Sequence, residues 1–285
     1  MTTLRSEVVR ATGALAGSGV PSPEADALAL AAFALGSDVA DVRRRMVMLD
    51  EADVAFLDRY ADLVAERAAR IPLQHLTGRA GFRRLELSVG PGVFVPRPET
   101  EFVAGLAIEA ALGLEAPVVV DLCTGSGAIA LAVADEVPSA TVYAVELGRE
   151  AHAWAVRNVT DSGLPVELRL GDATEAFPEL EGEVDIVVSN PPYIPAGMVP
   201  LDPEVRDHDP ELALFGGSPD GLAIPLAVAR RAAQLLRPGG LLVMEHADSQ
   251  GASMPHGLGR TGEWTEILDH DDLTGRPRAT TARRA

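Results

Sequence analysis

The chain has a single cysteine, few basic residues and no long apolar run, and each shortage excludes a class of protein. Cys123 is the one cysteine among 285 residues, so no disulfide can form within the chain, and a lone thiol suits a reducing compartment. The longest apolar stretch, about Ala25 to Leu35, is interrupted by Asp26 and is too short to cross a bilayer. Charged residues near the N-terminus stand where a secretory signal would have its apolar core. We therefore expect a cytoplasmic protein that does not associate with a membrane.

Basic residues are outnumbered, with 24 Lys and Arg against 42 Asp and Glu and a formal net charge of -18. This balance does not favour a wide positive surface that grips phosphate backbones, so we expect no direct nucleic-acid binding. The six histidines show no spacing typical of metal ligands, and the single cysteine adds little to them. The sequence therefore predicts no metal site.

The composition is that of an ordinary globular protein, and the residue types that dominate differ between three parts of the chain. Residues 1–74 are rich in Ala, Leu, Val, Glu and Arg, which predicts a helical domain; one helix should begin at Pro23 with Ser22 as N-cap, and another at Asp50 or Glu51. No residues in this region have a spacing typical of a catalytic site, and we expect the region to receive a partner or cover a cleft. Residues 75–97 are punctuated by glycines and predict a β-hairpin linker with strands at 83–89 and 93–95.

Residues 98–285 alternate short apolar strands with helices, the pattern of an open α/β fold. Thr100 is expected to cap a helix that runs from Glu101 to Leu112. A strand at 117–121 leads into Cys123-Thr124-Gly125-Ser126-Gly127 and a second helix, an arrangement that binds nucleotides. The glycine pattern alone also permits a dinucleotide.

Acidic residues follow the next two predicted strands. Glu146 ends the strand at 141–145, about twenty residues after the glycine turn, where a carboxylate can accept from both ribose hydroxyls of an adenosine. Asp172 follows the strand at 166–170 and can accept from an adenine amino group. Acids at the carboxyl ends of successive parallel strands are what a ligand crevice requires.

The strand at 184–188 is almost wholly apolar and β-branched, and it stops at Asn190-Pro191-Pro192-Tyr193. Prolines donate no N-H, so the Asn190 and Pro191 carbonyls are free to accept, and the Asn190 side-chain oxygen adds another acceptor. Tyr193 adds a flat face. Taken alone, the motif could be an ordinary turn at the end of a strand. In combination with the upstream glycine turn and Glu146, it favours a site that aims an NH2 group at a methyl sulfonium. Such a site is more consistent with the motif than one for hydride transfer.

Taken together, these motifs resemble the HemK/PrmC family of S-adenosylmethionine-dependent methyltransferases, which act on the glutamine of the Gly-Gly-Gln motif in peptide chain release factors. The resemblance rests on Pro-Arg-Pro-Glu-Thr-Glu at 96–101, Asp-Leu-Cys-Thr-Gly-Ser-Gly-Ala-Ile-Ala at 121–130, Glu146, Gly171-Asp172 and Asn-Pro-Pro-Tyr-Ile at 190–194. It continues through Glu-Val-Arg-Asp at 204–207, Leu-Arg-Pro-Gly-Gly at 236–240 and Glu-His at 245–246, and so covers nearly the whole chain.

The resemblance implies a Rossmann-like, seven-stranded class I methyltransferase domain with a small helical-bundle domain before it. The residues from Cys123 to Gly127 would wrap the methionine part of the cofactor, Glu146 would hold the ribose, and Asp172 and Ala173 would lie by the adenine. The segment from Asn190 to Tyr193 would hold the substrate glutamine, with Asn190 also touching the cofactor, and the catalytic set would be Asn190, Pro191 and Tyr193. The helical domain would dock a class I release factor, and we expect a monomer.

This chain departs from the family pattern at three places. Many relatives have glycine where Cys123 stands, and some place a large side chain where Ala173 stands. The segment after Gly251 is short and glycine-rich compared with the helix expected there. Two alternative functions remain open: an N-methyltransferase acting on adenine or guanine of nucleic acid, and a cofactor-binding module without catalysis.

Overall fold

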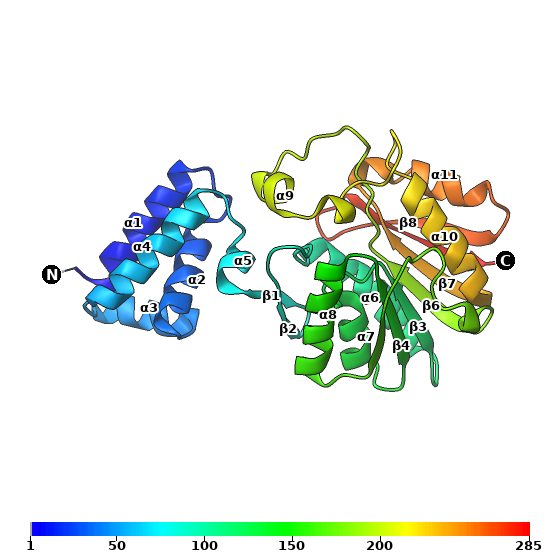
Figure 1. Ribbon diagram of the computed structural model, residues 1–285, viewed down its shortest axis with the longest axis horizontal. Helices are drawn as coiled ribbons and strands as arrows, with labels where there is room; N and C mark the ends of the chain where they lie inside the picture. The colour runs from blue at the N-terminus through cyan, green and yellow to red at the C-terminus, as the bar shows by residue number, and fades with distance from the viewer. Residues whose placement is uncertain (1) are drawn as a thin grey trace. The chain divides into compact units, whose positions relative to one another are not determined.

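The computed structural model describes residues 2–285, which divide into two compact units (Figure 1). The first unit comprises the chain up to Arg79 together with Pro200–His208, and the second comprises Ala80–Val199 and Asp209–Ala285. The chain therefore leaves the second unit after Val199 and returns to it at Asp209. Within residues 2–285, no helix combines the length and apolar character needed to span a bilayer.

The first unit is helical and has its own apolar core. Its helices are α1 (Leu4–Gly17), α2 (Pro23–Leu35), α3 (Val39–Met48), α4 (Val54–Ala68), α5 (Leu73–Thr77) and α9 (Pro203–His208). The helix α2 begins at Pro23 as predicted, although the Ser22 side chain makes no capping hydrogen bond. The helix predicted to begin at Asp50 or Glu51 is α4, which begins three or four residues later at Val54, because Asp53 caps it by accepting from the Phe56 amide at 2.8 Å. Residues 50–52 instead pair in extended form with the start of the chain.

Buried charges tie α9 into the helical unit. Arg67 on α4 donates to Asp26 on α2 at 2.7 Å, and it lies 2.8 Å from a carboxylate oxygen of Glu204 on α9. Arg70 donates twice to the same carboxylate, at 2.8 and 2.5 Å. These arginines hold the pKa of Glu204 down to about 2, against the raising effect of burial. The segment 200–208, which follows the Asn-Pro-Pro-Tyr loop in sequence, is thus part of the helical unit.

The second unit is built on a seven-stranded sheet in the order β5-β4-β3-β6-β7-β9-β8. Its strands are β3 (Val118–Leu122), β4 (Thr141–Glu146), β5 (Val166–Leu170), β6 (Val184–Ser189), β7 (Leu236–Glu245), β8 (Trp264–Asp271) and β9 (Pro277–Arg284). The first five are parallel, whereas β9 runs antiparallel to both β7 and β8. This is the predicted mostly parallel sheet with an antiparallel strand near its end, so the fold class is confirmed.

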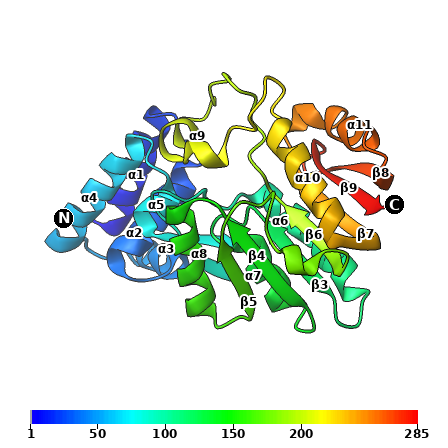
Figure 2. The ribbon, with the colours of Figure 1, turned by 45° about the vertical axis from the view of Figure 1, so that its right-hand side comes forward.

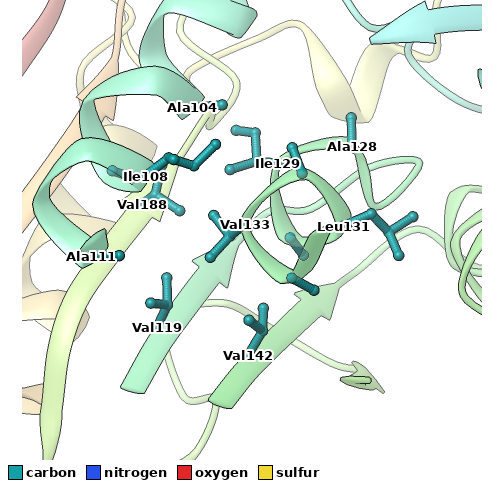
Figure 3. Packing of buried hydrophobic residues seen from close by; sticks show 14 of the residues in the cluster. Ala104, Ile108, Ala111, Val119, Ala128, Ile129, Leu131, Val133, Val142 and Val188 are labelled. Atoms are coloured by element: carbon teal, nitrogen blue, oxygen red, sulfur yellow. The ribbon is translucent and has the colours of Figure 1, made fainter. Parts of the chain in front are cut away.

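Helices cover both faces of the sheet (Figures 1 and 2). On one face, α6 (Pro98–Leu112) and α7 (Ala128–Glu136) enclose the larger apolar core with side chains such as Val119 and Val188, and Figure 3 shows this packing. On the other face, α10 (Ala223–Leu235) and α11 (Ser253–Gly259) pack over Leu122 and Leu242. The helix α8 (Arg149–Ser162) flanks β4 and β5. The short segment after Gly251 forms α11, where Met254 and Leu258 are buried.

The hairpin lies earlier than predicted. Its strands are β1 (Arg79–Phe82) and β2 (Leu85–Ser88), and the turn between them places Arg83 at φ +52°. No strand forms at 93–95. Gly90 begins a turn, since its carbonyl accepts from the Val93 amide at 3.4 Å, but it also allows close packing, because a Cβ there would lie 2.6 Å from Cζ2 of Trp154 on α8.

The start of α6 also differs from the prediction. The helix begins at Pro98, so Thr100 lies inside its first turn and does not cap it. Proline at the first helical position needs no amide partner, which explains the earlier start. The Thr100 side chain is buried and faces Asn190.

Candidate active site

Parallel pairing brings the predicted site residues to one edge of the sheet. Leu122 of β3 pairs with Val145 of β4 and with Ser189 of β6, which in turn pairs with Met244 of β7. The glycine turn, Glu146, the Asn-Pro-Pro-Tyr loop and Glu245 therefore all begin at neighbouring strand ends. Ligands of open α/β folds bind outside this edge.

The glycine turn after β3 has an unusual backbone. Cys123, Gly125 and Gly127 have φ values of +69°, +59° and +86°, so three of five residues are left-handed. Space around a Cβ at Gly125 is open, and the Thr124 amide donates to the Val145 carbonyl at 3.0 Å, which holds the turn against β4. Glycine adopts this conformation without cost, but Cys123 does so against a steric penalty.

Glu146 closes this turn from the next strand. Its Oε2 accepts from the Gly125 amide at 2.8 Å and its Oε1 from the Gly148 amide at 2.7 Å. A carboxylate oxygen can accept twice, so each oxygen retains one position for a ribose hydroxyl. Burial raises the pKa of Glu146, and the amide hydrogen bonds oppose this rise.

Asp121, which the sequence reasoning did not include among the cofactor residues, lies buried under the same turn. Its Oδ2 accepts from the Thr124 hydroxyl at 2.5 Å and from the Ala130 amide at 3.1 Å. Its Oδ1 is buried and has no hydrogen-bond partner among the described residues. Burial raises the pKa of Asp121 from 3.8 to about 7. The orphaned oxygen is an acceptor suited to a cationic group such as an ammonium.

Asp172 and Ala173 follow β5 at the same edge. Asp172 is exposed, and its Oδ1 accepts from the amide and hydroxyl of Thr174 at 2.8 and 2.7 Å, which leaves Oδ2 for a ligand. Ala173 is buried in the apolar cluster that includes Leu122.

The loop from Asn190 to Tyr193 is fixed by contacts with neighbouring elements, while two of its hydrogen-bond acceptors remain free. Asn190 Nδ2 donates to the Thr100 hydroxyl at 3.2 Å. Among the described residues, none donates to Asn190 Oδ1 or to the Pro191 carbonyl. Pro191 and Pro192 are buried, so the backbone at this point has little freedom to move.

Residues that the sequence reasoning did not assign a role fix the end of this loop. Gln250 Nε2 donates to the carbonyls of Tyr193 and Asp220 at 2.9 and 2.8 Å. The loop at Gly221 packs so closely that a Cβ there would lie 2.1 Å from the Tyr193 carbonyl oxygen. Side-chain packing of this kind depends on tertiary pairing and leaves no signal in local sequence.

Glu245, at the end of β7, lies next to the Tyr193 side chain. The Tyr193 hydroxyl donates to Glu245 Oε1 at 3.3 Å. Burial raises the pKa of Glu245 to about 7, although Thr100 and the charge of Arg278 oppose the rise. Burial and the nearby Glu245 charge likewise raise the pKa of Tyr193, so its hydroxyl stays protonated.

Asn158 on α8 joins the glycine turn to the hairpin. Its Nδ2 donates to the carbonyls of Ser126 and Ser88 at 2.9 and 3.0 Å, and its Oδ1 accepts from the Ser88 amide at 2.7 Å. All three contacts lie more than thirty residues away in sequence, so local pattern could not predict them.

Comparison with known proteins agrees with this geometry. Residues 8–78 match the PrmC N-terminal domain and residues 98–199 match the methyltransferase small domain. The release factor glutamine methyltransferase of Streptomyces coelicolor is 54% identical over 288 residues, which cover 100% of this chain and 99% of the relative. The chain belongs to this methyltransferase family. The predicted family and enzyme class are therefore confirmed, and the cofactor is S-adenosylmethionine.

The same family includes a relative with a different named substrate. The 4-amino-L-phenylalanine/4-methylamino-L-phenylalanine methyltransferase of Streptomyces pristinaespiralis is 42% identical over 271 residues, which cover 92% of this chain and 89% of the relative. Among solved structures, the 16S rRNA N2 G1207 methyltransferase RsmC of T. thermophilus, in complex with AdoMet and guanosine, has a TM-score of 0.51 at 21% identity. That likeness covers 73% of this chain and 50% of RsmC, and it supports the methyltransferase fold alone.

Proposed function

We propose that this protein transfers the methyl group of S-adenosylmethionine to the side-chain amide nitrogen of the glutamine in the Gly-Gly-Gln motif of class I peptide chain release factors. The observation that carries the proposal is the pair of free acceptors, Asn190 Oδ1 and the Pro191 carbonyl, at the carboxyl end of β6. Full-length similarity to a release factor glutamine methyltransferase supports the substrate.

The residues at the sheet edge fit the cofactor. Glu146 retains two acceptor positions for the ribose hydroxyls, and the orphaned Oδ1 of Asp121 suits the ammonium of the methionine part. The left-handed turn from Cys123 through Thr124, Gly125 and Ser126 to Gly127 would wrap that part. Asp172 and Ala173 would border the adenine, and Asn190 would touch both cofactor and substrate. When bound, the cofactor supplies a methyl group on a positively charged sulfur.

The loop from Asn190 to Tyr193 would help the glutamine amide nitrogen to act as a nucleophile. An amide nitrogen reacts poorly because its lone pair is delocalised into the carbonyl. If Asn190 Oδ1 and the Pro191 carbonyl accept its two N-H groups, they hold the nitrogen in line with the methyl and stabilise the positive charge that develops on it. Tyr193 and Pro192 would border the side chain, and the amide proton is lost as the new carbon–nitrogen bond forms.

Three parts of the chain would divide recognition and catalysis between them. We assign docking of the release factor to the helical domain (1–74), a linker role to the hairpin segment (75–97) and methyl transfer to residues 98–285. The protein would act as a monomer in the cytoplasm without binding nucleic acid directly. The net charge of -18 supports the last point, since a nucleic-acid enzyme needs a positive groove.

An aromatic amine is the second candidate substrate, because a relative of 42% identity is named for 4-amino-L-phenylalanine. An aniline nitrogen also offers two N-H groups to an acceptor pair. A free amino acid, however, also needs partners for its own carboxylate and ammonium groups, whereas a peptide glutamine does not.

The test uses purified protein, S-adenosylmethionine and a class I release factor, followed by mass spectrometry of the peptide that contains Gly-Gly-Gln. Parallel reactions contain the release factor with that glutamine changed to alanine, 4-amino-L-phenylalanine, duplex DNA and ribosomal RNA. We expect one methyl group on the glutamine and none in the alanine control. Transfer to the amino acid or nucleic acid alone would replace the proposed substrate, and cofactor binding without any transfer would indicate a non-catalytic module.

A further inference from the structure

We propose that Gln250 is a positioning residue that sets the direction in which the Asn190–Tyr193 loop presents its backbone acceptor to the substrate. The inference rests on the proposed function, in which the Pro191 carbonyl accepts from the substrate amide. Pro191 and Pro192 are buried, and each proline ring fixes one of the two backbone angles of its residue, so the loop moves nearly as one piece with Tyr193. A group that holds the Tyr193 carbonyl therefore also sets the direction of the Pro191 carbonyl.

The side-chain amide of Gln250 is bonded through both of its N-H groups and through its oxygen. Its Nε2 donates to the carbonyls of Tyr193 and Asp220 at 2.9 and 2.8 Å, and its Oε1 accepts from the Ala247 amide at 2.9 Å. The residue is 3% exposed. A backbone N-H can only donate and a backbone carbonyl can only accept, so all three bonds form in one orientation of the side-chain amide. Gln250 is thus a double donor fixed toward the loop.

The backbone from which Gln250 reaches the loop is also held in place. Gln250 ends the short 3-10 helix Asp248–Gln250 that follows β7, and its own amide donates to the Ala247 carbonyl at 2.8 Å. The next residue packs against the start of β9, because a Cβ at Gly251 would lie 2.6 Å from Cβ of Pro277. Gln250 therefore ties the loop to the sheet.

The second carbonyl that Gln250 binds belongs to the segment 214–221, which pairs with the continuation of the loop. The Ile194 amide donates to the Leu214 carbonyl at 2.8 Å, and the Gly216 amide donates to the Ile194 carbonyl at 2.9 Å. Ile194 follows Tyr193 directly, so these bonds and the Gln250 side chain act on adjacent residues. Gln250 joins the loop, its paired segment and the end of β7 at one point.

Gly221 shows how closely these parts approach. It has φ +74°, and a Cβ there would lie 2.1 Å from the Tyr193 carbonyl oxygen and 2.9 Å from Gln250 Nε2. Any side chain at this position would push the Tyr193 carbonyl away from Gln250. The position of that carbonyl is therefore set from two sides, by the Gln250 donor and by the absence of a side chain at Gly221.

The first test is Gln250→Glu, which keeps the size of the side chain and the oxygen that faces Ala247 but places a second oxygen against the two carbonyls. At pH 8 we expect kcat on the release factor to fall by about tenfold or more, with cofactor Kd within about threefold of wild type. Burial and the facing carbonyls raise the pKa of the introduced carboxyl, so it takes up a proton as the pH falls to 5.5 and donates to one carbonyl again. The ratio of its kcat to that of wild type should then rise by about threefold or more.

Two further variants separate this effect from general damage. Gln250→Met has a similar length without a donor, so its kcat should be low at both pH values. Gln234→Glu on α10 is the matched control, because Gln234 is exposed and the same substitution there should leave kcat unchanged at both pH values. A ratio for Gln250→Glu that is the same at pH 8 and pH 5.5, or a kcat equal to that of wild type at pH 8, would overturn the proposal.

Gly221→Ala reaches the same carbonyl without changing Gln250. We expect it to lower kcat by about tenfold or more at both pH values, with cofactor Kd within about threefold of wild type. Gly182→Ala is its control, since Gly182 has nearly the same backbone angle, φ +76°, and no atom lies within 4 Å of an added Cβ. Equal losses of kcat in these two variants would overturn the proposal, because strain alone would then account for the effect.

Hydrogen exchange provides a measurement that does not depend on activity. At pH 8 the amides of Ile194 and Gly216 should exchange about tenfold or more faster in Gln250→Glu than in wild type, while amides of β3 and β4 keep their wild-type rates. Unchanged exchange at Ile194 and Gly216 would show that Gln250 does not hold the loop. If the wild type methylates no release factor, the proposed function fails, and this measurement still decides the role of Gln250.

Discussion

The burial of Asp121 predicts how strongly the stability of the fold depends on pH. The residue is fully buried and its pKa is raised from 3.8 to about 7. The native state thus holds the proton more tightly than the unfolded chain does, and the stability this provides is fully present below about pH 3.8 and is lost as the pH rises through 7. Between pH 5 and pH 8 the unfolded carboxyl is already ionised. At 1.36 kcal/mol per pKa unit, we expect this group alone to lower the free energy of unfolding by roughly 3 kcal/mol over that interval.

The Asp121→Asn variant removes this pH dependence. Its amide oxygen can still accept from Thr124 and Ala130, while its NH2 group takes the place of Oδ1 without an acceptor, at a cost of about 1–3 kcal/mol. This cost is the same at every pH. The stability of the variant relative to wild type should therefore rise by roughly 3 kcal/mol from pH 5 to pH 8, whatever its value at pH 5.

Urea unfolding followed by circular dichroism at pH 5 and pH 8 measures this difference directly. Asp161→Asn is the control, because Asp161 is an exposed carboxylate on α8 and should show no such change. A difference between Asp121→Asn and wild type that is the same at both pH values would refute the assigned role of burial. We also expect the variant to bind S-adenosylmethionine more weakly, because it presents a donor to the cofactor ammonium.

Three further predictions concern other residues. Asn190→Ala should lower kcat by about 10²-fold in the release factor assay while calorimetry shows little change in cofactor affinity, and equal losses would make Asn190 mainly a cofactor contact. Because Cys123 has φ +69°, Cys123→Gly should leave the thermal midpoint unchanged or raise it, whereas Cys123→Val should lower the free energy of unfolding by about 1–2 kcal/mol; a lower midpoint for the glycine variant would contradict this. Glu204→Gln should cost roughly 3 kcal/mol at pH 7, because its pKa is lowered from 4.5 to about 2. Glu204 stabilises the fold above pH 4.5 and loses this effect as the pH falls toward 2, so the deficit should shrink in urea melts at pH 3, and a constant deficit would contradict the assignment.

The sequence allowed the sheet and the position of its ligand edge to be predicted, because buried parallel strands appear as apolar runs with polar residues directly after them. Glu146 and Asn190 lie at strand ends for this reason. The hairpin was misplaced because the turn at Gly90 does form but no strand follows it, so the two paired strands lie earlier in the chain. Glu245 was part of the quoted motifs but had no assigned role, since its partner Tyr193 is distant in sequence and meets it only through the pairing of β6 and β7.

The path of the chain between the two compact units limits how the protein can be divided. The chain passes from one unit to the other at residues 79/80, 199/200 and 208/209. A fragment that ends at Arg79 would lack α9, so Arg70 would lose its Glu204 partner and Arg67 would keep Asp26 and the Ile71 carbonyl but lose Glu204. A fragment that begins at Ala80 would retain α9 without the arginines that hold it. The helical unit therefore cannot be removed as one continuous segment. Exchanging it between relatives requires the transfer of two separate segments, one of which begins seven residues after Tyr193.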